Sequence, residues 1–249
     1  MSGAQAPAEI KAILLDIEGT TTPIRFVYDV LFPYARTHLG QHIEQHASSP
    51  DYERLFDALR EEHASDVAAG GSVPGSWVDA PRASRLASVA AYCSWLMDRD
   101  RKSTMLKALQ GKVWEAGYIS GELVGEVFPD VPAAFERWHV RRLPVGIFSS
   151  GSVLAQQLLF RYSSAGDLSG FVDWYFDTAI GAKIESVSYR RIAESIEIGT
   201  DRVLFVSDAT RELDAARTAG MHTRLAVRPG NLSSHEGGFP VIHTFDEIG

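Results

Sequence analysis

The sequence predicts an α/β fold, in which a parallel sheet flanked by helices forms a core domain that is interrupted by an inserted all-helical domain. Short apolar runs rich in strand-forming residues recur along the chain, and most are followed by a turn signal and then a helical pattern. This alternation is typical of βαβ units. After the first run, about a hundred residues show helical periodicity only.

Each expected strand is a short apolar run that ends at a turn signal. These runs are residues 11–16, 143–149, 174–177, 203–207 and 223–227. Parallel strands covered on both faces are nearly continuous in apolar residues, as these runs are.

The expected insertion follows the first strand and has the apolar spacing of helices. Its expected helices are residues 33–47, 51–67, 81–100 and 103–117. We therefore predict a cap domain over residues 26–125 and a core domain made of residues 1–25 and 126–249. An insertion at this point of the chain is expected to act as a lid.

Composition excludes several classes of function. The 249-residue chain has a formal net charge of −8, which argues against a nucleic-acid groove. No apolar run is long enough to cross a bilayer, and residues 1–9 lack a signal pattern, so we expect a cytoplasmic protein with no membrane partner. Cys93 is the single cysteine, which rules out an intrachain disulfide. Without a heptad stripe, we expect a monomer.

Other conspicuous residues are expected to have structural roles. The histidines His38, His42, His46 and His63 lack the paired acid of a zinc-binding helix, so solvated or capping positions are expected for them. The five tryptophans are expected to be packing residues. Cys93 is expected to be buried in a helix.

An acidic motif, Asp16-Ile17-Glu18-Gly19-Thr20, follows the first expected strand. A buried strand would deliver Asp16 to its carboxyl end, where open α/β sheets bind ligands. There Asp16 could attack phosphorus, while Glu18 transfers protons. By itself, the motif fits a solvated turn equally well.

Hydroxyl groups follow the second expected strand, at Ser149 and Ser150. A helix begins just after them, with Ser152 as its expected N-cap. Hydroxyls and free N–H groups at a helix N-terminus bind phosphate. The alternative is that both serines only fill a turn.

A lysine and a second acid come later in the chain. Lys183 lies in a loop before an expected helix at residues 186–198. A cation there would reduce the repulsion between Asp16 and a phosphate dianion, although most lysines are surface groups. Asp208 follows the strand at 203–207, and Asp16 and Asp208 together could offer oxygens to Mg²⁺.

Two further acids, Glu212 and Asp214, begin the helix that Gly220 is expected to close. They could orient metal-bound waters, or they could be first-turn acids favoured by the helix dipole. The sequence leaves both alternatives open.

An acid, a hydroxyl, a lysine and an acid in this order resemble the haloacid dehalogenase (HAD) superfamily, whose phosphatases use an aspartate nucleophile. The resemblance spans residues 11–24 and 143–228, with the insertion in the cap position. It implies a Rossmann-like parallel-sheet HAD core domain with an inserted helical cap. One departure is Glu18, where those phosphatases usually carry Asp.

Longer motifs point to a narrower family. They are Leu15 to Ile24, Phe26-Val27, Leu31-Phe32-Pro33-Tyr34, Asp100-Arg101-Lys102, Leu109-Gln110-Gly111, Trp114, Ser149 to Ser152, Phe176-Asp177-Thr178, Asp208 with Thr210-Arg211-Glu212, and Arg228-Pro229-Gly230-Asn231. These motifs closely resemble the acireductone synthase family, the enolase-phosphatases of methionine salvage.

That resemblance implies the site residues and the reaction. It gives Asp16, Glu18 and Asp208 as Mg²⁺ ligands, Ser149, Ser150 and Lys183 as substrate-binding residues, and Asp16, Glu18 and Lys183 as catalytic residues. The implied substrate is 2,3-diketo-5-methylthiopentyl-1-phosphate, which is enolised and then dephosphorylated to the acireductone 1,2-dihydroxy-3-keto-5-methylthiopentene. Whether Glu18 binds the metal by its side chain or its backbone stays open.

Other functions on the same fold are a generic small-molecule phosphatase, a metal-free dehalogenase and a non-catalytic binding protein. Asp208 argues against the dehalogenase, and the presence of all four site positions argues against the binding protein. In the cap, we expect Lys102 to begin a helix, where a basic group needs an anionic partner. That partner would be the substrate or a cap carboxylate.

Overall fold

The structure is a computed structural model that describes residues 9–230 and 238–248 of the chain. The chain divides into two compact units. One, which we call the core unit, comprises Met1–Val27 and Leu123–Gly249, and the other, the helical unit, is Tyr28–Glu122.

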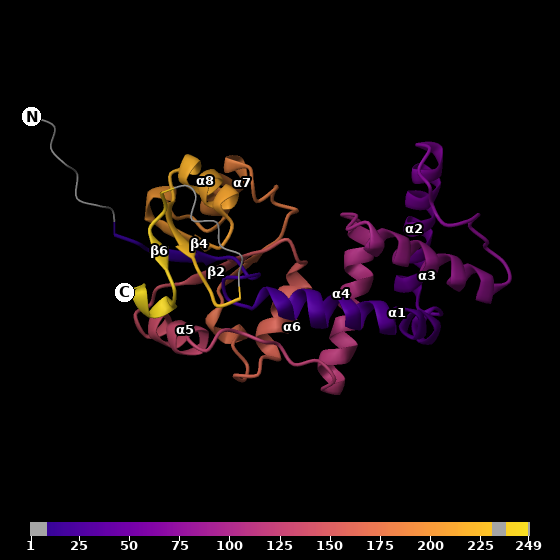
Figure 1. Ribbon diagram of the computed structural model, residues 1–249, viewed down its shortest axis with the longest axis horizontal. Helices are drawn as coiled ribbons and strands as arrows, with labels where there is room; N and C mark the ends of the chain where they lie inside the picture. The colour runs from indigo at the N-terminus through magenta and orange to yellow at the C-terminus, as the bar shows by residue number, and fades with distance from the viewer. Residues whose placement is uncertain (1–8, 231–237, 249) are drawn as a thin grey trace, which may run out of the picture. The chain divides into compact units, whose positions relative to one another are not determined.

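A parallel sheet forms the centre of the core unit (Figure 1). Its described strands are β1 (Ala12–Leu15), β2 (Val145–Phe148), β3 (Trp174–Phe176), β4 (Val203–Ser207), β5 (His222–Ala226) and β6 (Val241–Ile242), in the order β3-β2-β1-β4-β5-β6. Every residue of β1, β2 and β4 is buried, as in strands that helices cover on both faces. The predicted parallel sheet is confirmed, with β6 as a short strand that was not expected.

The register places the carboxyl ends of the central strands side by side. Leu15 of β1 lies opposite Ile147 of β2 and Val206 of β4. Residues that follow these three strands therefore emerge at one edge of the sheet, on both sides of the residue that follows β1.

Helices cover both faces of this sheet (Figure 1). They are α5 (Val131–Val140), α6 (Val153–Arg161), α7 (Ser186–Ser195) and α8 (Thr210–Ala219), with short helices η2 (Ser169–Phe171), η3 (Thr200–Arg202) and η4 (Phe245–Glu247). On one face, Ile192 of α7 and Leu213 of α8 pack with Phe205 of β4 in one buried cluster. On the other, Phe135 of α5 lies 5.7 Å from Phe160 of α6, measured between ring centroids.

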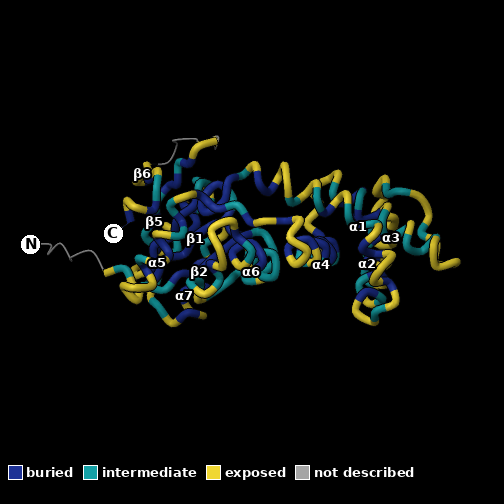
Figure 2. The backbone as a smooth tube through the Cα atoms, turned by 90° about the horizontal axis from the view of Figure 1, so that it is seen from below, coloured by how far each residue is buried: buried dark blue, intermediate teal, exposed yellow. Residues whose placement is uncertain are grey.

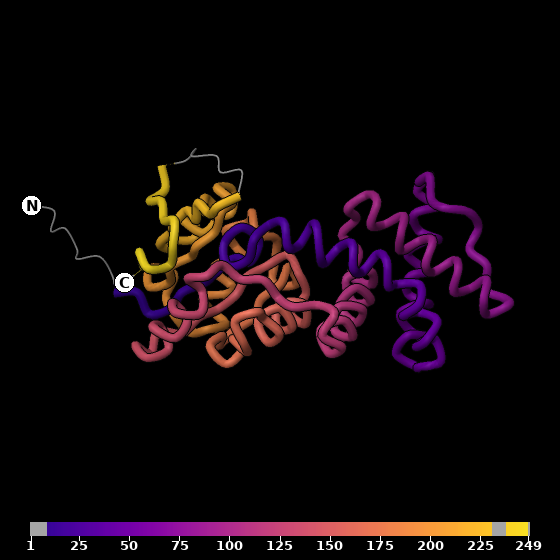
Figure 3. Tube along the Cα trace, turned by 60° about the horizontal axis from the view of Figure 1, so that its bottom comes forward, coloured from indigo at the N-terminus to yellow at the C-terminus, as the bar shows by residue number. Residues whose placement is uncertain are grey.

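The helical unit contains the four predicted helices. A π-helix, η1 (Phe26–Leu31), precedes α1 (Phe32–His46), α2 (Pro50–Ala68), α3 (Arg82–Asp98) and α4 (Thr104–Ser120), whose path Figure 3 traces from indigo to magenta. Helices α1 and α2 each contact α3 and α4. Leu39, Phe56, Tyr92 and Leu109, one from each helix, are buried in its core, and buried segments of these helices are dark blue in Figure 2.

Helix ends follow the expected chemistry. Ser152 caps α6, because its hydroxyl accepts a bond from Ala155 N, and Ser103 caps α4 in the same way. Gly220 ends α8 with φ 98°, a left-handed conformation that glycine adopts without strain. The predictions for Ser152 and Gly220 are confirmed.

Three other predictions for side chains are tested. Cys93 is buried in α3, and Trp95, Trp114 and Trp138 are buried, as predicted. The expectation of solvated histidines is wrong for two of them, His42 and His63, which are buried. Both lie on the inward faces of their helices, and a histidine at such a position is carried into the core by its apolar neighbours.

The position of Lys102 also differs from the prediction. Helix α4 starts at Thr104 with Ser103 as N-cap, so Lys102 lies outside the helix. Its ammonium is 3.3 Å from a carboxylate oxygen of Asp100, and both side chains are exposed. Of the two expected partners, the structure contains the cap carboxylate.

No helix in the described parts of the chain is long and apolar enough to cross a membrane.

Candidate active site

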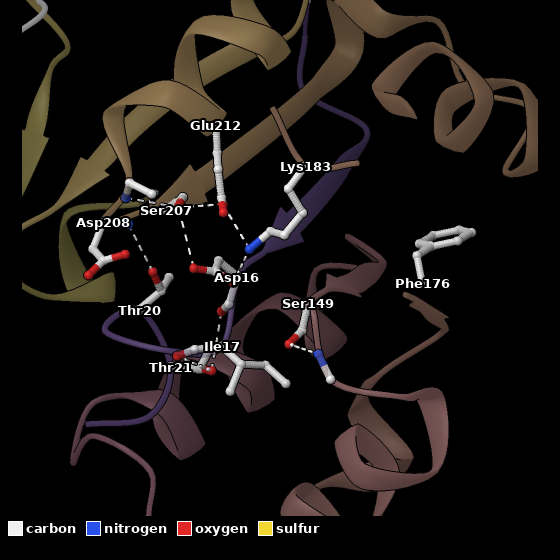
Figure 4. Close-up of polar contacts among 12 residues, drawn as sticks. Asp16, Ile17, Thr20, Thr21, Ser149, Phe176, Lys183, Ser207, Asp208 and Glu212 are labelled. Atoms are coloured by element: carbon white, nitrogen blue, oxygen red, sulfur yellow. Dashed lines mark hydrogen bonds and ion pairs between the residues drawn. The ribbon is translucent and has the colours of Figure 1, made fainter. Parts of the chain in front are cut away.

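The predicted site residues follow three neighbouring strands of the core unit (Figure 4). Asp16 follows β1, Ser149 follows β2, and Asp208 follows β4. Because β1 lies between the other two strands, Asp16 is at the centre of the group. Asp16 and Ser149 are both 2% exposed, so they face the interior of this edge rather than open solvent.

Lys183 reaches this group from the loop between β3 and α7. Its ammonium is paired with Asp16 Oδ1, and lies 2.8 Å from Glu212 Oε2. Burial alone would lower the pKa of Lys183, but the negative charges of Asp16, Glu212 and Glu18 outweigh burial and raise this pKa above its ordinary value. Lys183 is therefore a buried cation of the site, and not a solvated surface lysine.

Two aromatic residues hold the lysine in place. Tyr189 Oη of α7 donates a hydrogen bond of 2.7 Å to the backbone oxygen of Lys183. The ammonium also lies 5.8 Å from the ring centroid of Phe148, within the range of a cation–π contact. Sequence reasoning missed Tyr189, because it is part of the apolar stripe of its helix and belongs to no motif.

The loop after β1 is shaped by its glycine and threonines. Gly19 has φ 72°, which explains the glycine of the motif. Thr20 and Thr21 are fully buried. Thr21 Oγ1 donates to the backbone oxygen of Asp16 at 3.3 Å, and Thr20 Oγ1 accepts from Asp208 N at 3.1 Å. The loop is thus tied to both acids of the site.

Ser207, the last residue of β4, lies between two carboxylates (Figure 4). Its hydroxyl oxygen is 3.4 Å from Asp16 Oδ2 and 3.0 Å from Glu212 Oε2. A hydroxyl carries one hydrogen, so it donates to one of these acceptors at a time. The sequence predicts Ser207 only as the last residue of a strand, and nothing in the local pattern indicates this role.

Negative charge exceeds positive charge in the site. Burial, together with the charges of Asp16, Glu212 and Glu18, raises the pKa of Asp208 to about 7, although Lys183 opposes the shift. Burial and Asp16 also raise the pKa of Glu212 above its ordinary value. Such shifts are expected where several carboxylates share one buried ammonium.

The structure separates the roles of the two acids of α8. Glu212 is one helical turn beyond Asp208 and contacts Lys183. Asp214 pairs with Arg217 at 2.6 Å on the surface, where the Asp214 side chain is 55% exposed. Asp214 lies beyond the first turn of α8, where Glu212 is the acid, so neither expected role applies to Asp214, whereas Glu212 belongs to the site.

The serine loop is held by a residue that sequence reasoning also missed. Ser149 Oγ accepts a bond of 3.0 Å from Gly151 N. Gln156 of α6 is buried, and its amide nitrogen donates to Gly151 O at 2.8 Å and to Phe176 O at 2.9 Å. Ser150, which follows Ser149, is partly buried. An amide in an apolar helix pattern is the only sequence signal of this contact.

Comparison with known proteins identifies the family. Residues 10–220 match the family model of haloacid dehalogenase-like hydrolases. Enolase-phosphatase E1 of Synechococcus elongatus is 50% identical over 242 residues, which cover 97% of this chain and 99% of that protein. Enolase-phosphatase E1 of Pectobacterium carotovorum is 47% identical over 241 residues, or 96% of each chain. This chain belongs to the enolase-phosphatase E1 family of haloacid dehalogenase-like hydrolases.

A solved structure agrees with this assignment. The crystal structure of the UTR4 protein of Saccharomyces cerevisiae is 34% identical, covers 96% of this chain and 99% of that chain, and superposes with a TM-score of 0.76. The resemblance to enolase-phosphatases that the sequence motifs predict is therefore confirmed. Asn231, in one of those motifs, lies outside the described residues.

The carboxylates of the site include oxygen donors of the kind that bind Mg²⁺ in proteins. Within residues 9–230 and 238–248, no group of three or more His, Cys, Asp or Glu side chains is placed to hold an ion. Mg²⁺, however, commonly takes only one or two carboxylates and keeps several waters. Asp16 and Asp208, with the excess negative charge around them, fit such a cation.

Proposed function

We propose that this protein is a Mg²⁺-dependent enolase-phosphatase that converts 2,3-diketo-5-methylthiopentyl-1-phosphate to the acireductone and inorganic phosphate. One observation carries the proposal: a buried carboxylate, Asp16, is paired with a buried ammonium, Lys183, at the carboxyl edge of a parallel sheet. The relatives named enolase-phosphatase E1, at 47% and 50% identity, support the type of reaction, and the substrate is the one that the resemblance of the motifs implies.

In the phosphatase step, Asp16 acts as the nucleophile. Its carboxylate oxygen attacks phosphorus, the bond between phosphorus and the ester oxygen breaks, and Glu18 gives that oxygen a proton. Glu18 then takes a proton from water as the water attacks the phosphoaspartate. Cleavage of the bond between phosphorus and Asp16 releases phosphate and restores both residues.

The other site residues bind the phosphate and balance its charge. Lys183 offsets the repulsion between Asp16 and the incoming dianion, and stabilises the charge that develops during transfer. Ser149 and Ser150 would donate to phosphate oxygens from the loop that Gln156 holds. Tyr189 keeps the backbone of Lys183 in position.

Asp16 and Asp208, with Glu18 through its side chain or its backbone oxygen, would hold Mg²⁺. When bound, Mg²⁺ would polarise the substrate oxygens for enolisation and neutralise the phosphoryl group. Ser207 and Thr21 then have the task of orienting Asp16, because they contact its carboxylate and its backbone.

Replacement of the nucleophile tests the mechanism. Asp16→Asn is nearly isosteric and removes the nucleophilic charge, so phosphate release should fall below detection while the far-ultraviolet circular dichroism is unchanged. Enolisation is followed separately, through the ultraviolet absorbance of the enediol. Substantial phosphate release by Asp16→Asn would show that the phosphoaspartate mechanism is wrong.

Two assays distinguish the alternative functions. A metal-free dehalogenase would keep its turnover in EDTA, whereas the proposed enzyme should lose it. A generic phosphatase would hydrolyse p-nitrophenyl phosphate as well as the diketo phosphate, and a binding protein would turn over neither. We also propose that the protein acts on this small molecule as a cytoplasmic monomer, and light scattering tests the oligomeric state.

A further inference from the structure

Arg228 is a buried charged residue to which the proposed reaction assigns no role. It lies beyond the carboxyl end of β5, in the Arg228-Pro229-Gly230 stretch of the family motifs. Its side chain is 1% exposed. Moving a guanidinium out of water is unfavourable unless buried partners compensate for the lost hydration. The partners of Arg228 therefore indicate what this residue is for.

The guanidinium of Arg228 joins three separate segments of the core unit. Its Nη1 donates to Asp130 Oδ2 and to His243 O, both at 2.8 Å. Its Nε donates to the backbone oxygen of Thr20 at 3.0 Å. The planar group also lies 4.3 Å from the ring centroid of Phe245. Arg228 thus connects the loop after β1 to α5 and to the C-terminal segment.

Thr20 connects Arg228 to the site through two hydrogen bonds. Its backbone oxygen is held by Arg228, while its hydroxyl accepts the bond from Asp208 N. Thr20 is fully buried and is four residues from Asp16 in the same loop. Figure 4 shows the bond that joins the Thr20 hydroxyl to Asp208. One threonine therefore couples the two loops that carry the carboxylates.

The contacts do not describe a residue that serves stability alone. Buried ion pairs are often no more stabilising than apolar side chains of similar volume. An apolar residue could fill the same space, but it could not form the directional bonds to Thr20 and Asp130.

We infer that Arg228 is a positioning residue: by holding the Thr20 backbone, it sets the separation of Asp16 and Asp208. This inference rests on the proposed function, in which those two carboxylates hold Mg²⁺. It assigns Arg228 no contact with substrate or metal. Its effect passes through Thr20, and its planar fork matters more than its charge.

The experiment compares Arg228→Met and Arg228→Lys with the wild-type protein. Isothermal titration calorimetry with MgCl₂ measures the Mg²⁺ Kd, and kinetics with the diketo phosphate give kcat and KM. Loss of a direct partner of a metal ligand typically costs about 10–100-fold in affinity or activity, and Arg228 acts one residue further out, so we expect the Mg²⁺ Kd to rise and kcat to fall by about 10-fold, the lower end of that range. KM should change little, because Ser149, Ser150 and Lys183 are untouched. Arg228→Lys should restore little of the Mg²⁺ affinity or of kcat, because an ammonium lacks the planar, forked set of donors of a guanidinium.

Arg137 provides a matched control. It is an arginine of α5 that donates to Phe245 O at 2.7 Å and pairs with Asp246 at 3.2 Å, and so ties the same C-terminal segment without touching Thr20. Arg137→Met should lower the midpoint of urea unfolding and leave the Mg²⁺ Kd unchanged.

Two outcomes would overturn the inference. If Arg228→Lys folds and binds Mg²⁺ as the wild-type protein does, the inference is wrong. It is also wrong if Arg137→Met weakens Mg²⁺ binding as much as the Arg228 variants do. If Arg228→Met fails to fold, two other variants still test the inference. They are Arg228→Lys and the milder Asp130→Asn, which changes the ion pair of Arg228 and leaves its bond to Thr20. A wild-type protein that binds no Mg²⁺ would instead overturn the proposed metal site itself.

Discussion

At the scale of single residues, the site is defined by an imbalance of charge. Asp16, Glu18, Asp208 and Glu212 act on one another and on a single buried ammonium, Lys183. That imbalance favours a cation, and we propose that Lys183 offsets the charge of the phosphate when substrate enters.

We predict that Lys183→Ala raises KM for the diketo phosphate and lowers kcat, because the ammonium stabilises the transition state more than the ground state. Lys183→Arg should recover little of the lost activity, because a planar guanidinium does not fit the position of the compact ammonium between Asp16 and Glu212. Steady-state kinetics check this. Lys11→Ala is the control, because Lys11 is a half-exposed lysine paired with Glu9. Kinetics of Lys183→Ala like those of the control would contradict a role for Lys183.

We predict that a second residue, His42, makes the stability of the protein depend on pH. It is buried in α1, and its Nε2 is 2.6 Å from Tyr52 Oη. Burial, with the charges of His46 and Lys112, lowers the pKa of His42 from 6.5 to about 4. Between pH 6.5 and about 4, the imidazole of His42 binds a proton in the unfolded chain but not in the folded protein. The contribution of neutral His42 to the free energy of unfolding is therefore complete above pH 6.5 and is lost as the pH falls toward 4.

Urea unfolding at pH 7 and pH 5 tests this dependence. The wild-type protein should lose on the order of 1 kcal/mol more between these two pH values than His42→Gln, after allowance for solvent screening. His42→Gln keeps a polar partner for Tyr52 and does not titrate. An equal loss in both proteins would mean that His42 is not the responsible group.

At the scale of elements, two helical glycines of the helical unit have opposite surroundings. A Cβ at Gly117 of α4 would lie 2.6 Å from the Tyr34 ring, whereas a Cβ at Gly40 of α1 would meet nothing within 4 Å. Tyr34 has little freedom to move aside, because it donates a 2.7 Å bond to Glu122 and stacks on His38. The close approach of α4 to α1 therefore requires glycine at position 117 and does not require it at position 40.

We predict opposite effects for the same substitution at these two positions. Gly117→Ala should destabilise by about 1–3 kcal/mol, as overpacking does. Gly40→Ala should stabilise by up to about 1 kcal/mol, through helix propensity. Chemical unfolding measures both, and a stabilised Gly117→Ala would show that α1 and α4 separate readily.

At the scale of the whole molecule, all the predicted site residues lie in the core unit. The units change at Val27/Tyr28 and Glu122/Leu123, while the sequence places the domain boundaries at residues 25/26 and 125/126. The domain assignment remains a proposal. Because the site is contained in one unit, binding of a metal there should stabilise that unit through mass action.

Calorimetric unfolding with and without Mg²⁺ tests this linkage. A free ion concentration of 100 times Kd contributes about 2.7 kcal/mol, so Mg²⁺ should raise the unfolding temperature of the wild-type protein, and EDTA should reverse the effect. Asp208→Ala should show little shift, because one of few direct ligands is gone. Asp214→Ala, which removes an exposed acid of α8, should keep the full shift. If Asp208→Ala also keeps it, Mg²⁺ binds elsewhere.

The sequence alone determined the elements and the chemistry of the motifs. Periodicity is a local property, so apolar runs located the main strands and the four helices of the insertion, and turn signals located Ser152 and Gly220 as caps. The order of Asp16, Ser149, Lys183 and Asp208 indicated a phosphate site, with three of them after predicted strands and Lys183 in the loop before a predicted helix. The 50% sequence identity to an enolase-phosphatase agrees with that interpretation.

Only the tertiary structure decided which distant residues meet. The strand order places β1 between β2 and β4, which brings Asp208 beside Asp16 although they are far apart in the sequence. The same packing buries Lys183 against Glu212 and sends Arg228 to Thr20. A lysine or arginine at an exposed position would have the same local sequence pattern. Its partners depend on contacts between segments, and burial then determines whether its charge acts in water or in the interior, where electrostatic interactions are stronger.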